Sequence, residues 1–387
     1  MIRTILNIIL GAFLYLYNVF ESLLSLNFPY RLQLFEFGDL YLVPTFIKYH
    51  FQITLTAQWT RRLPLLQSHA PAHHATALLT QILANITDTA TTPYTIIEFC
   101  SGAGGPTPHI ERAVNAARLR SNLPPILFRL SDIVPNLEAW IPLSAASEHL
   151  SFIPQPVNAL DPPPSTISVS SRGGIHVPLS GEYADEEVSV TGKVTVDEGR
   201  QVQRERDREA MKATCTARTK VMHLFCLSFH HFEDEDARRV IRSMLSNSDA
   251  FCVVELQERS LGCLAMLALE PVLLFLVSWY WFWGDWSQLF WTYVVPVLPV
   301  LHGWDGVVSC LRTRTFGEMR EMIDGVIAEA RREMEKDLVF NGQPKGRWQG
   351  VVQDQWTISE ARAKHTWPAG YLHATIGIRK EIRRGMD

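Results

Sequence analysis

The chain has 387 residues, enough for one large domain or for one domain with appendages. Its apolar content of 47% and charged content of 20% are typical of a globular protein, and a formal net charge of −4 without a basic tract argues against a nucleic-acid partner. None of the six cysteines forms a CxxC pair, so we expect free, buried thiols and neither a disulfide framework nor a zinc site.

The N-terminus begins with a long apolar segment. Residues 5–20 carry no charge, and the apolar run resumes after Glu21, which brings it close to the roughly 20 residues that a spanning helix needs. No small-x-small cleavage site follows, which disfavours a signal peptide. We therefore predict a hydrophobic membrane helix over residues 1–27, with a buried or lid-forming helix as the alternative.

After this segment the sequence changes from helical to alternating patterns. Residues 28–92 have apolar positions at helical spacing and are predicted to form a helical lead-in or lid, which ends in the turn-rich stretch 87–93. Strand-like runs then alternate with helix-like runs, and this order predicts a parallel sheet covered on both faces. The predicted strands are 95–100, 126–132, 150–157, 220–229 and 250–257, followed by a closing pair at 347–356 and 371–380 with the turn HTWPAG between them.

Two segments interrupt this order. Residues 161–207 are rich in Ser, Gly, Pro and charge, and we interpret them as a flexible surface insertion. Residues 261–302 carry only Glu270 and Asp285 as charges, together with five of the eleven tryptophans. Both ends of this Trp-rich segment join the same fold, so we expect a helical hairpin, a re-entrant element or an interfacial pair of helices, with a dimer interface or substrate lid as the soluble alternative.

The most informative motif is TIIEFCSGAGGP at 95–106, a strand that ends in three glycines and leads into a helix. Glycines at such a point let a ligand approach the backbone closely. A dinucleotide-binding GxGxxG fingerprint is disfavoured, because Thr107 stands where its third glycine would be and the next acid at a strand end, Asp132, comes late. A glycine turn without a ligand is a further alternative.

The segment from Glu98 to Gly105 resembles the first motif of the class I S-adenosylmethionine-dependent methyltransferases. In that superfamily the glycine loop holds the methionine part of the cofactor, the acid helps to order the loop, and small residues such as Cys100 are common at the first glycine position. An acid after the second strand binds the ribose hydroxyls, and Asp132 matches it; two charge-assisted hydrogen bonds to vicinal hydroxyls explain the choice of a carboxylate.

Two later motifs also fit this resemblance. After the third strand the family often has an acid that accepts from the adenine amino group, and here Asn158 takes that position, with Asp161 nearby; an amide carbonyl can accept the same hydrogen bond. The run HLFCLSFHHFED resembles the end of the fourth strand, where residues face cofactor and acceptor. His230 and His231 are therefore candidates for an acceptor-side catalytic base, or for a strand cap that packs under the cofactor.

The resemblance covers residues 90–260 and 303–380 and implies an α/β fold: a Rossmann-like seven-stranded methyltransferase sheet with an N-terminal helical region and a hydrophobic helical insertion after strand five. The methyltransferase domain would comprise 93–260 and 303–387. The cofactor-binding residues that it implies are Glu98, Cys100, Ser101, Gly102, Gly104, Gly105, Asp132, Asn158, Ala159 and Leu227. No metal site is expected.

The function that follows is S-adenosylmethionine-dependent methyl transfer to an apolar or amphiphilic small molecule, such as a lipid-like acceptor, by a membrane-associated enzyme with an intracellular methyltransferase domain. S-adenosylmethionine is the expected cofactor, and no nucleic-acid partner is expected. Two alternatives stay open. One is a membrane-attached cofactor-binding protein that has lost catalysis, and the other is an NAD-dependent reductase.

Overall fold

The computed structural model describes residues 2–86, 89–90, 92–162, 220–341 and 355–380. The predicted insertion at 161–207 and the first residues of the predicted strand at 347–356 lie almost entirely outside this part of the chain. The described residues divide into two compact units. The helical unit comprises Met1–His74, Glu255–Thr315 and Arg362–His373, and the sheet unit comprises Ala75–Val254, Phe316–Ala361 and Ala374–Asp387.

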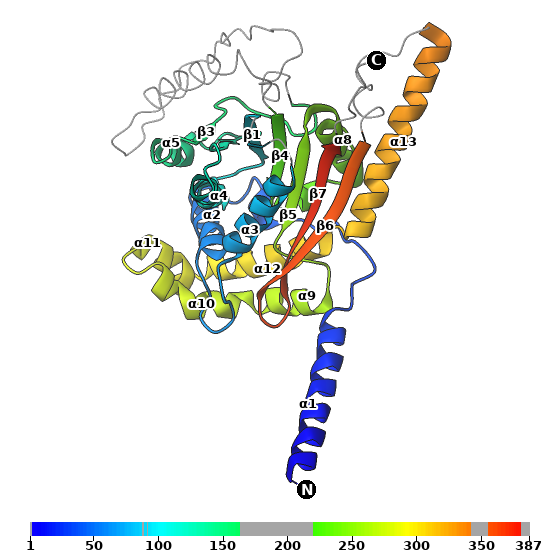
Figure 1. The fold of residues 1–387 in the computed structure, drawn as a ribbon. Coiled ribbons are helices and arrows are strands. Elements are labelled where there is room, and N and C mark those ends of the chain that lie inside the picture. The colour runs from blue at the N-terminus through cyan, green and yellow to red at the C-terminus, as the bar shows by residue number, and fades with distance from the viewer. Residues whose placement is uncertain (1, 87–88, 91, 163–219, 342–354, 381–387) are drawn as a thin grey trace. The chain divides into compact units, whose positions relative to one another are not determined.

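Seven strands form a single sheet in the order β3-β2-β1-β4-β5-β7-β6 (Figure 1). The strands are β1 (Tyr94–Phe99), β2 (Leu127–Leu130), β3 (Leu150–Phe152), β4 (Lys220–Cys226), β5 (Ala250–Glu255), β6 (Gln355–Thr366) and β7 (Gly370–Lys380). The first five pair in parallel, and β6 and β7 are joined by a short turn that makes them an antiparallel hairpin. This is the α/β sheet that the methyltransferase resemblance implies, and that prediction is confirmed.

Helices precede, connect and follow these strands. They are α1 (Ile2–Leu24), α2 (Thr45–Thr60), α3 (Pro71–Asn85), α4 (Thr107–Arg120), α5 (Leu137–Ala145), α8 (Asp234–Asn247), α9 (Leu261–Ala268), α10 (Glu270–Trp281), α11 (Trp286–Leu289), α12 (Val297–Arg312) and α13 (Phe316–Asn341). Short helical turns lie at η1 (Phe37–Asp39) and η2 (Phe229–His231), and a π-helical turn, η3, at Phe290–Val294. The region between β5 and α13 is thus helical throughout.

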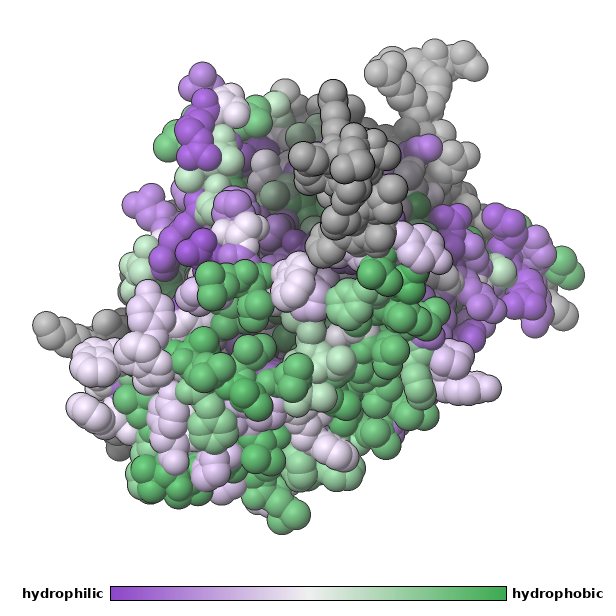
Figure 2. All heavy atoms as spheres, turned by 90° about the horizontal axis from the view of Figure 1, so that it is seen from below, coloured by the Kyte–Doolittle hydropathy of each residue, from purple (hydrophilic) through white to green (hydrophobic). Residues whose placement is uncertain are grey.

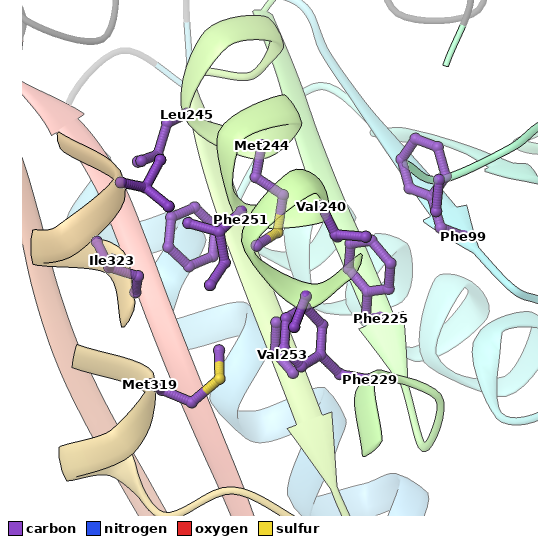
Figure 3. Packing of buried hydrophobic residues seen from close by; sticks show 14 of the residues in the cluster. Phe99, Phe225, Phe229, Val240, Met244, Leu245, Phe251, Val253, Met319 and Ile323 are labelled. Atoms are coloured by element: carbon purple, nitrogen blue, oxygen red, sulfur yellow. The ribbon is translucent and has the colours of Figure 1, made fainter. Parts of the chain in front are cut away.

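The core of the sheet unit lies between the sheet and two helices, α8 and α13. Figure 3 shows Met244 and Leu245 of α8 and Ile323 of α13 packed around Phe251 of β5, all of them almost completely buried. Every residue of β1, β4 and β5 is buried, which accounts for their nearly continuous apolar sequences. Helix α8 begins with Asp234, Glu235 and Asp236, whose negative charges stabilise the N-terminal end of the helix.

Three predicted strands had clearly wrong bounds. The fourth, predicted over 220–229, ends at Cys226, and Phe229 lies in η2. The third ends at Phe152 and not at Val157, because Pro154 and Pro156 lack the amide hydrogens that a strand needs. The sixth covers Gln355–Thr366, most of which the sequence analysis had placed in the loop before the last strand. The turn at 367–369 before β7 agrees with the predicted HTWPAG turn. None of the five described cysteines forms a disulfide.

Among the described side chains, no single helix is long and apolar enough to cross a membrane. Two bent pairs of helices meet the same criteria of length and composition: α9 with α10, bent by 52°, and Trp286–Val294 with α12, bent by 75°. The side chains of residues 2–10 fall outside this set. The membrane helix over residues 1–27 therefore stays a prediction.

Candidate functional site

The glycine loop between β1 and α4 has an unusual backbone. Cys100, Gly102, Gly104 and Gly105 have φ angles of 57°, 51°, 98° and 45°. Left-handed backbone costs an L-residue about 1–2 kcal/mol, so glycine is favoured here and the non-glycine Cys100 is held in a strained conformation by its surroundings. Four left-handed residues within six positions turn the chain sharply and bring its amides to the carboxyl end of the sheet.

Gly104 and Gly105 are needed for different reasons. A Cβ on Gly104 would lie 2.9 Å from Cδ1 of Leu143 in α5, so this glycine allows the loop and the helix to pack closely. A Cβ on Gly105 would meet no atom within 4 Å. The space beside Gly105 is therefore open, and a ligand could approach the backbone there.

Asp132 lies two residues after the end of β2 and contacts the loop. Its Oδ2 accepts a hydrogen bond from the Gly102 amide at 2.9 Å, and its Oδ1 accepts one from the Val134 amide at 3.0 Å. The side chain is half-buried. Each carboxylate oxygen has a second lone pair, so Asp132 can still accept hydrogen bonds from a ligand. The structure thus joins the predicted acid to the predicted glycine loop.

Trp140 of α5 was not singled out by sequence reasoning. Its indole is completely buried, and its Nε1–H donates to the carbonyl of Gly102 at 2.9 Å. Gly102 is therefore fixed from both sides, by Asp132 at its amide and by Trp140 at its carbonyl. A tryptophan in the helix after β2 was the available signal, but helical tryptophans are common in cores, and periodicity alone cannot show which of them reaches a loop.

Ser101 and Ser131 connect the loop to the strands beneath it. The Ser101 amide donates to the Ser131 carbonyl at 3.1 Å, and both serine hydroxyls donate to the Glu98 carbonyl, at 3.1 and 2.6 Å. Ser101, predicted to bind the cofactor, is itself buried, so its side chain supports the loop from below.

Glu98 is the residue before the last of β1, and its side chain is buried under the loop. Burial raises the pKa of its carboxyl to about 8, although the hydroxyls of Thr107 and Ser101 and the thiol of Cys226 favour the ionised form. The carboxyl is therefore largely protonated at neutral pH. Burial, with the charges of Asp132 and Glu98, likewise raises the pKa of the Cys100 thiol, which stays neutral.

The end of β4 presents the next group of predicted residues. Leu227 has a φ of 54°, and its amide donates to the Val254 carbonyl at 2.8 Å, so the chain turns sharply as it leaves the sheet. His230 and His231 follow in the turn η2, with ring centroids 4.3 Å apart; His230 is buried and His231 is half-buried. Of the two rings, His231 is the more accessible to an acceptor. A catalytic role for either histidine stays a prediction.

Asn158 lies in the connection after β3. Its Oδ1 accepts from the Leu160 amide at 3.0 Å, so this side chain stabilises its own turn, and the residue is exposed. The adjacent Ala159 is buried in the core of the sheet unit. The side-chain NH2 group of Asn158 can still donate. Its carbonyl oxygen already accepts from Leu160, so the predicted hydrogen bond from the adenine amino group would have to share that oxygen.

Taken together, the sheet unit places a left-handed glycine loop, a half-buried carboxylate and a histidine pair after β1, β2 and β4. The carboxyl ends of parallel strands are where open α/β sheets bind ligands. The sheet order is the one that the class I S-adenosylmethionine-dependent methyltransferase resemblance implies, and the glycine loop and the acid after β2 lie at the positions that this resemblance predicts.

Comparison with solved structures finds proteins of similar fold, several of them methyltransferases. LepI, solved with S-adenosylmethionine, is 12% identical with a TM-score of 0.39, and the match covers 89% of this chain and 55% of LepI, so the chain spans about half the length of that protein. Magnesium protoporphyrin IX methyltransferase (ChlM) from Synechocystis PCC 6803 is 9% identical with a TM-score of 0.35, over 88% of this chain and all of ChlM.

The plantazolicin methyltransferase BpumL, solved with S-adenosylhomocysteine and a substrate analogue, is 13% identical with a TM-score of 0.37, over 86% of this chain and 91% of BpumL. No protein-family model and no curated protein sequence matches the chain.

Proposed function

We propose that the protein transfers a methyl group from S-adenosylmethionine to a small-molecule acceptor. The observation that carries this proposal is the contact between the Asp132 carboxylate and the Gly102 amide, which places an acid beside a left-handed glycine loop at the carboxyl edge of the sheet. A carboxylate there can accept from two vicinal ribose hydroxyls, which are the donors that this cofactor offers.

The residues present fit that cofactor. The open space beside Gly105 leaves room for a ligand against the backbone, and Asp132 has unused lone pairs. When bound, S-adenosylmethionine would supply an electrophilic methyl group on a positively charged sulfur. The negative charge of Asp132 would attract the positively charged sulfur. Glu98 beneath the loop would stay neutral, so the site would not have to bury a second negative charge.

The chain's own residues would contribute mainly by alignment. Methyl transfer is an in-line displacement: the acceptor atom forms the new bond to carbon, and sulfur leaves with the electron pair of the broken bond. Holding two reactants in line and excluding water accounts for most of the rate that such a site needs. Where the acceptor is a hydroxyl or a protonated amine, its proton must leave, and His231 or His230 would receive it.

We further propose that the acceptor is apolar or amphiphilic and is encountered at a membrane, with the methyltransferase domain on the intracellular side. The support for this is the apolar character of the helical unit, whose helices α9–α12 expose many large hydrophobic side chains. An acceptor that partitions into lipid would be concentrated at the same surface.

Calorimetry with S-adenosylhomocysteine tests the cofactor site. We expect binding by the wild-type protein, a loss of at least tenfold in Asp132→Ala, and a smaller loss in Asp132→Asn, whose carbonyl can still accept from Gly102. Glu138→Ala, which removes an exposed acid on α5, is the matched control and should bind normally. Failure of the wild type to bind, or unchanged binding by Asp132→Ala, would refute the proposal.

Turnover is tested separately. Membranes and extracts incubated with the protein and methyl-labelled S-adenosylmethionine should yield one extractable product that carries the label. Binding without any labelled product would instead support the cofactor-binding protein that has lost catalysis.

A further inference from the structure

Helix α10 has its apolar face on the outside. Its exposed side chains recur at intervals of three and four residues, the spacing that places them on one side of a helix, and the stripe continues past the end of the helix. The members of this outer stripe are Val272, Phe275, Leu276, Trp279, Tyr280 and Trp283. In a water-soluble bundle such a stripe would face the core. Here Leu276 is 64% exposed and Trp283 is 79% exposed.

The polar groups of the same helices point the other way. Glu270, at the start of α10, forms a hydrogen bond with Gln58 of α2, and Ser278 is buried. Gln288 is completely buried, with its amide donating to Thr54 at 2.6 Å and its carbonyl bonded to His50 at 2.7 Å. The helices therefore pair their polar side chains toward α2 and present hydrocarbon and aromatic groups outward.

Acidic side chains are sparse in this segment, and the exposed one, Asp285, caps a helix. Residues 261–302 contain two acids, and both are engaged: Glu270 with Gln58, and Asp285 as the N-cap of α11, where its Oδ1 accepts from the Gln288 amide at 3.0 Å. Figure 2 shows hydrophobic side chains covering much of the face seen from below.

The lengths and bends of the helices exclude a straight crossing. Helices α9, α10 and α12 have 8, 12 and 16 residues, so the longest extends about 24 Å, against roughly 30 Å of hydrocarbon in a bilayer. The two bent pairs change direction by 52° and 75°. A helix whose exposed face is apolar and whose polar groups point into the protein can lie in the plane of the interface.

The aromatic and basic residues fit that position. Trp279, Tyr280 and Trp283 have an apolar ring with one polar atom, the type of side chain that gathers at the headgroup boundary. Arg61 lies with its guanidinium 5.2 Å from the ring of Phe282, next to Trp283, and Arg61 and Arg62 are both exposed. Cations at this edge would meet the negative headgroups of an anionic leaflet.

We infer that α9–α11 and the outer stripe form a monotopic membrane-binding surface, which lies in one leaflet of an anionic lipid bilayer without crossing it. This deepens the membrane part of the proposed function. Its test measures lipid binding without methyl transfer, so that either proposal can fail while the other stands.

Flotation of the full-length protein with vesicles tests the surface. The probes are vesicles of phosphatidylcholine alone and vesicles in which part of it is replaced by phosphatidylserine. We expect wild-type binding that is stronger on the anionic vesicles, and at least a tenfold weaker partition for the Leu276→Glu/Trp279→Glu double variant. Leu119→Glu is the matched control, because Leu119 is 75% exposed in α4, which is not part of the stripe, and should leave binding unchanged.

A second measurement needs no variant. Tryptophan fluorescence of the vesicle-bound wild type should be quenched more by lipids brominated near the carbonyls than by lipids brominated near the chain ends. Wild-type-like flotation of the double variant would overturn the inference, since another segment would then hold the protein. Stronger quenching from the chain ends would overturn the one-leaflet position, and a concentration-dependent dimer that ignores vesicles and is dissociated by the double variant would assign the face to a second copy.

Discussion

Substituting alanine at Gly104 should separate the two reasons for glycine in the loop. At a φ of 98° the backbone costs an L-residue at least about 1–2 kcal/mol, and the added Cβ, 2.9 Å from Cδ1 of Leu143, would add about 1–3 kcal/mol of overpacking. We therefore expect Gly104→Ala to lower the free energy of unfolding by about 2–5 kcal/mol. Gly105→Ala, at a φ of 45° with no atom in reach, should cost only about 1 kcal/mol.

The assay is urea unfolding followed by circular dichroism, with Leu143→Ala and the Gly104→Ala/Leu143→Ala double variant completing a thermodynamic cycle. The double variant should be about 1–3 kcal/mol more stable than the sum of the single effects, because the contact that Leu143 makes with the new methyl group is gone. Calorimetry with S-adenosylhomocysteine should rank the two variants the other way. Relative to the stability that each variant loses, Gly105→Ala should weaken binding more than Gly104→Ala, since Gly105 borders the open space. Equal destabilisation at the two positions, or no coupling with Leu143, would refute the reasoning.

Two buried titratable groups give predictions of opposite sign. The folded-state pKa of Glu98 is about 8, above its usual value of 4.5, so the stability of the wild type should fall as pH rises from 4.5 to about 8, by on the order of a few kcal/mol. Glu98→Gln should remove that dependence, and parallel pH profiles of the two proteins would contradict it. Burial lowers the pKa of His223 to about 3, so stability should be lost as pH falls from 6.5 toward 3. His223→Leu should unfold at lower pH than the wild type in an acid titration followed by circular dichroism, and an unchanged acid midpoint would show that this histidine is solvated.

Much of the sheet could be predicted because its strands are buried on both faces. The runs that became β1, β4 and β5 are mostly apolar, and the glycines after β1 mark the end of the strand. β6 was largely missed for the opposite reason. It is the last strand in the sheet order, and its charged residues, among them Glu360, Arg362 and Lys364, are typical of an edge strand that avoids pairing with other chains.

The candidate site was predictable as a set of residues but not as a set of contacts. Sequence order places Asp132 after β2, yet only the folded chain shows that its carboxylate accepts from Gly102 and that Trp140 holds the same residue from the other side. The supporting positions of Ser101 and Ser131 were hidden for the same reason. Small polar residues at strand ends satisfy backbone groups in many proteins, and their pattern carries no information about which loop they support.

The two backbone amides that hold Asp132 also bear on the kinetics of ligand capture. Because the carboxylate already has both oxygens oriented, by Gly102 and Val134, an arriving ribose would find its acceptors fixed and would not have to freeze a rotating side chain. Immobilising such a side chain costs about 0.5–1.5 kcal/mol on binding, so fixing it in advance moves that entropy loss from association into folding. The loop and the acid then behave as one rigid receptor, and encounter with the cofactor should follow a single exponential without a slower rearrangement phase.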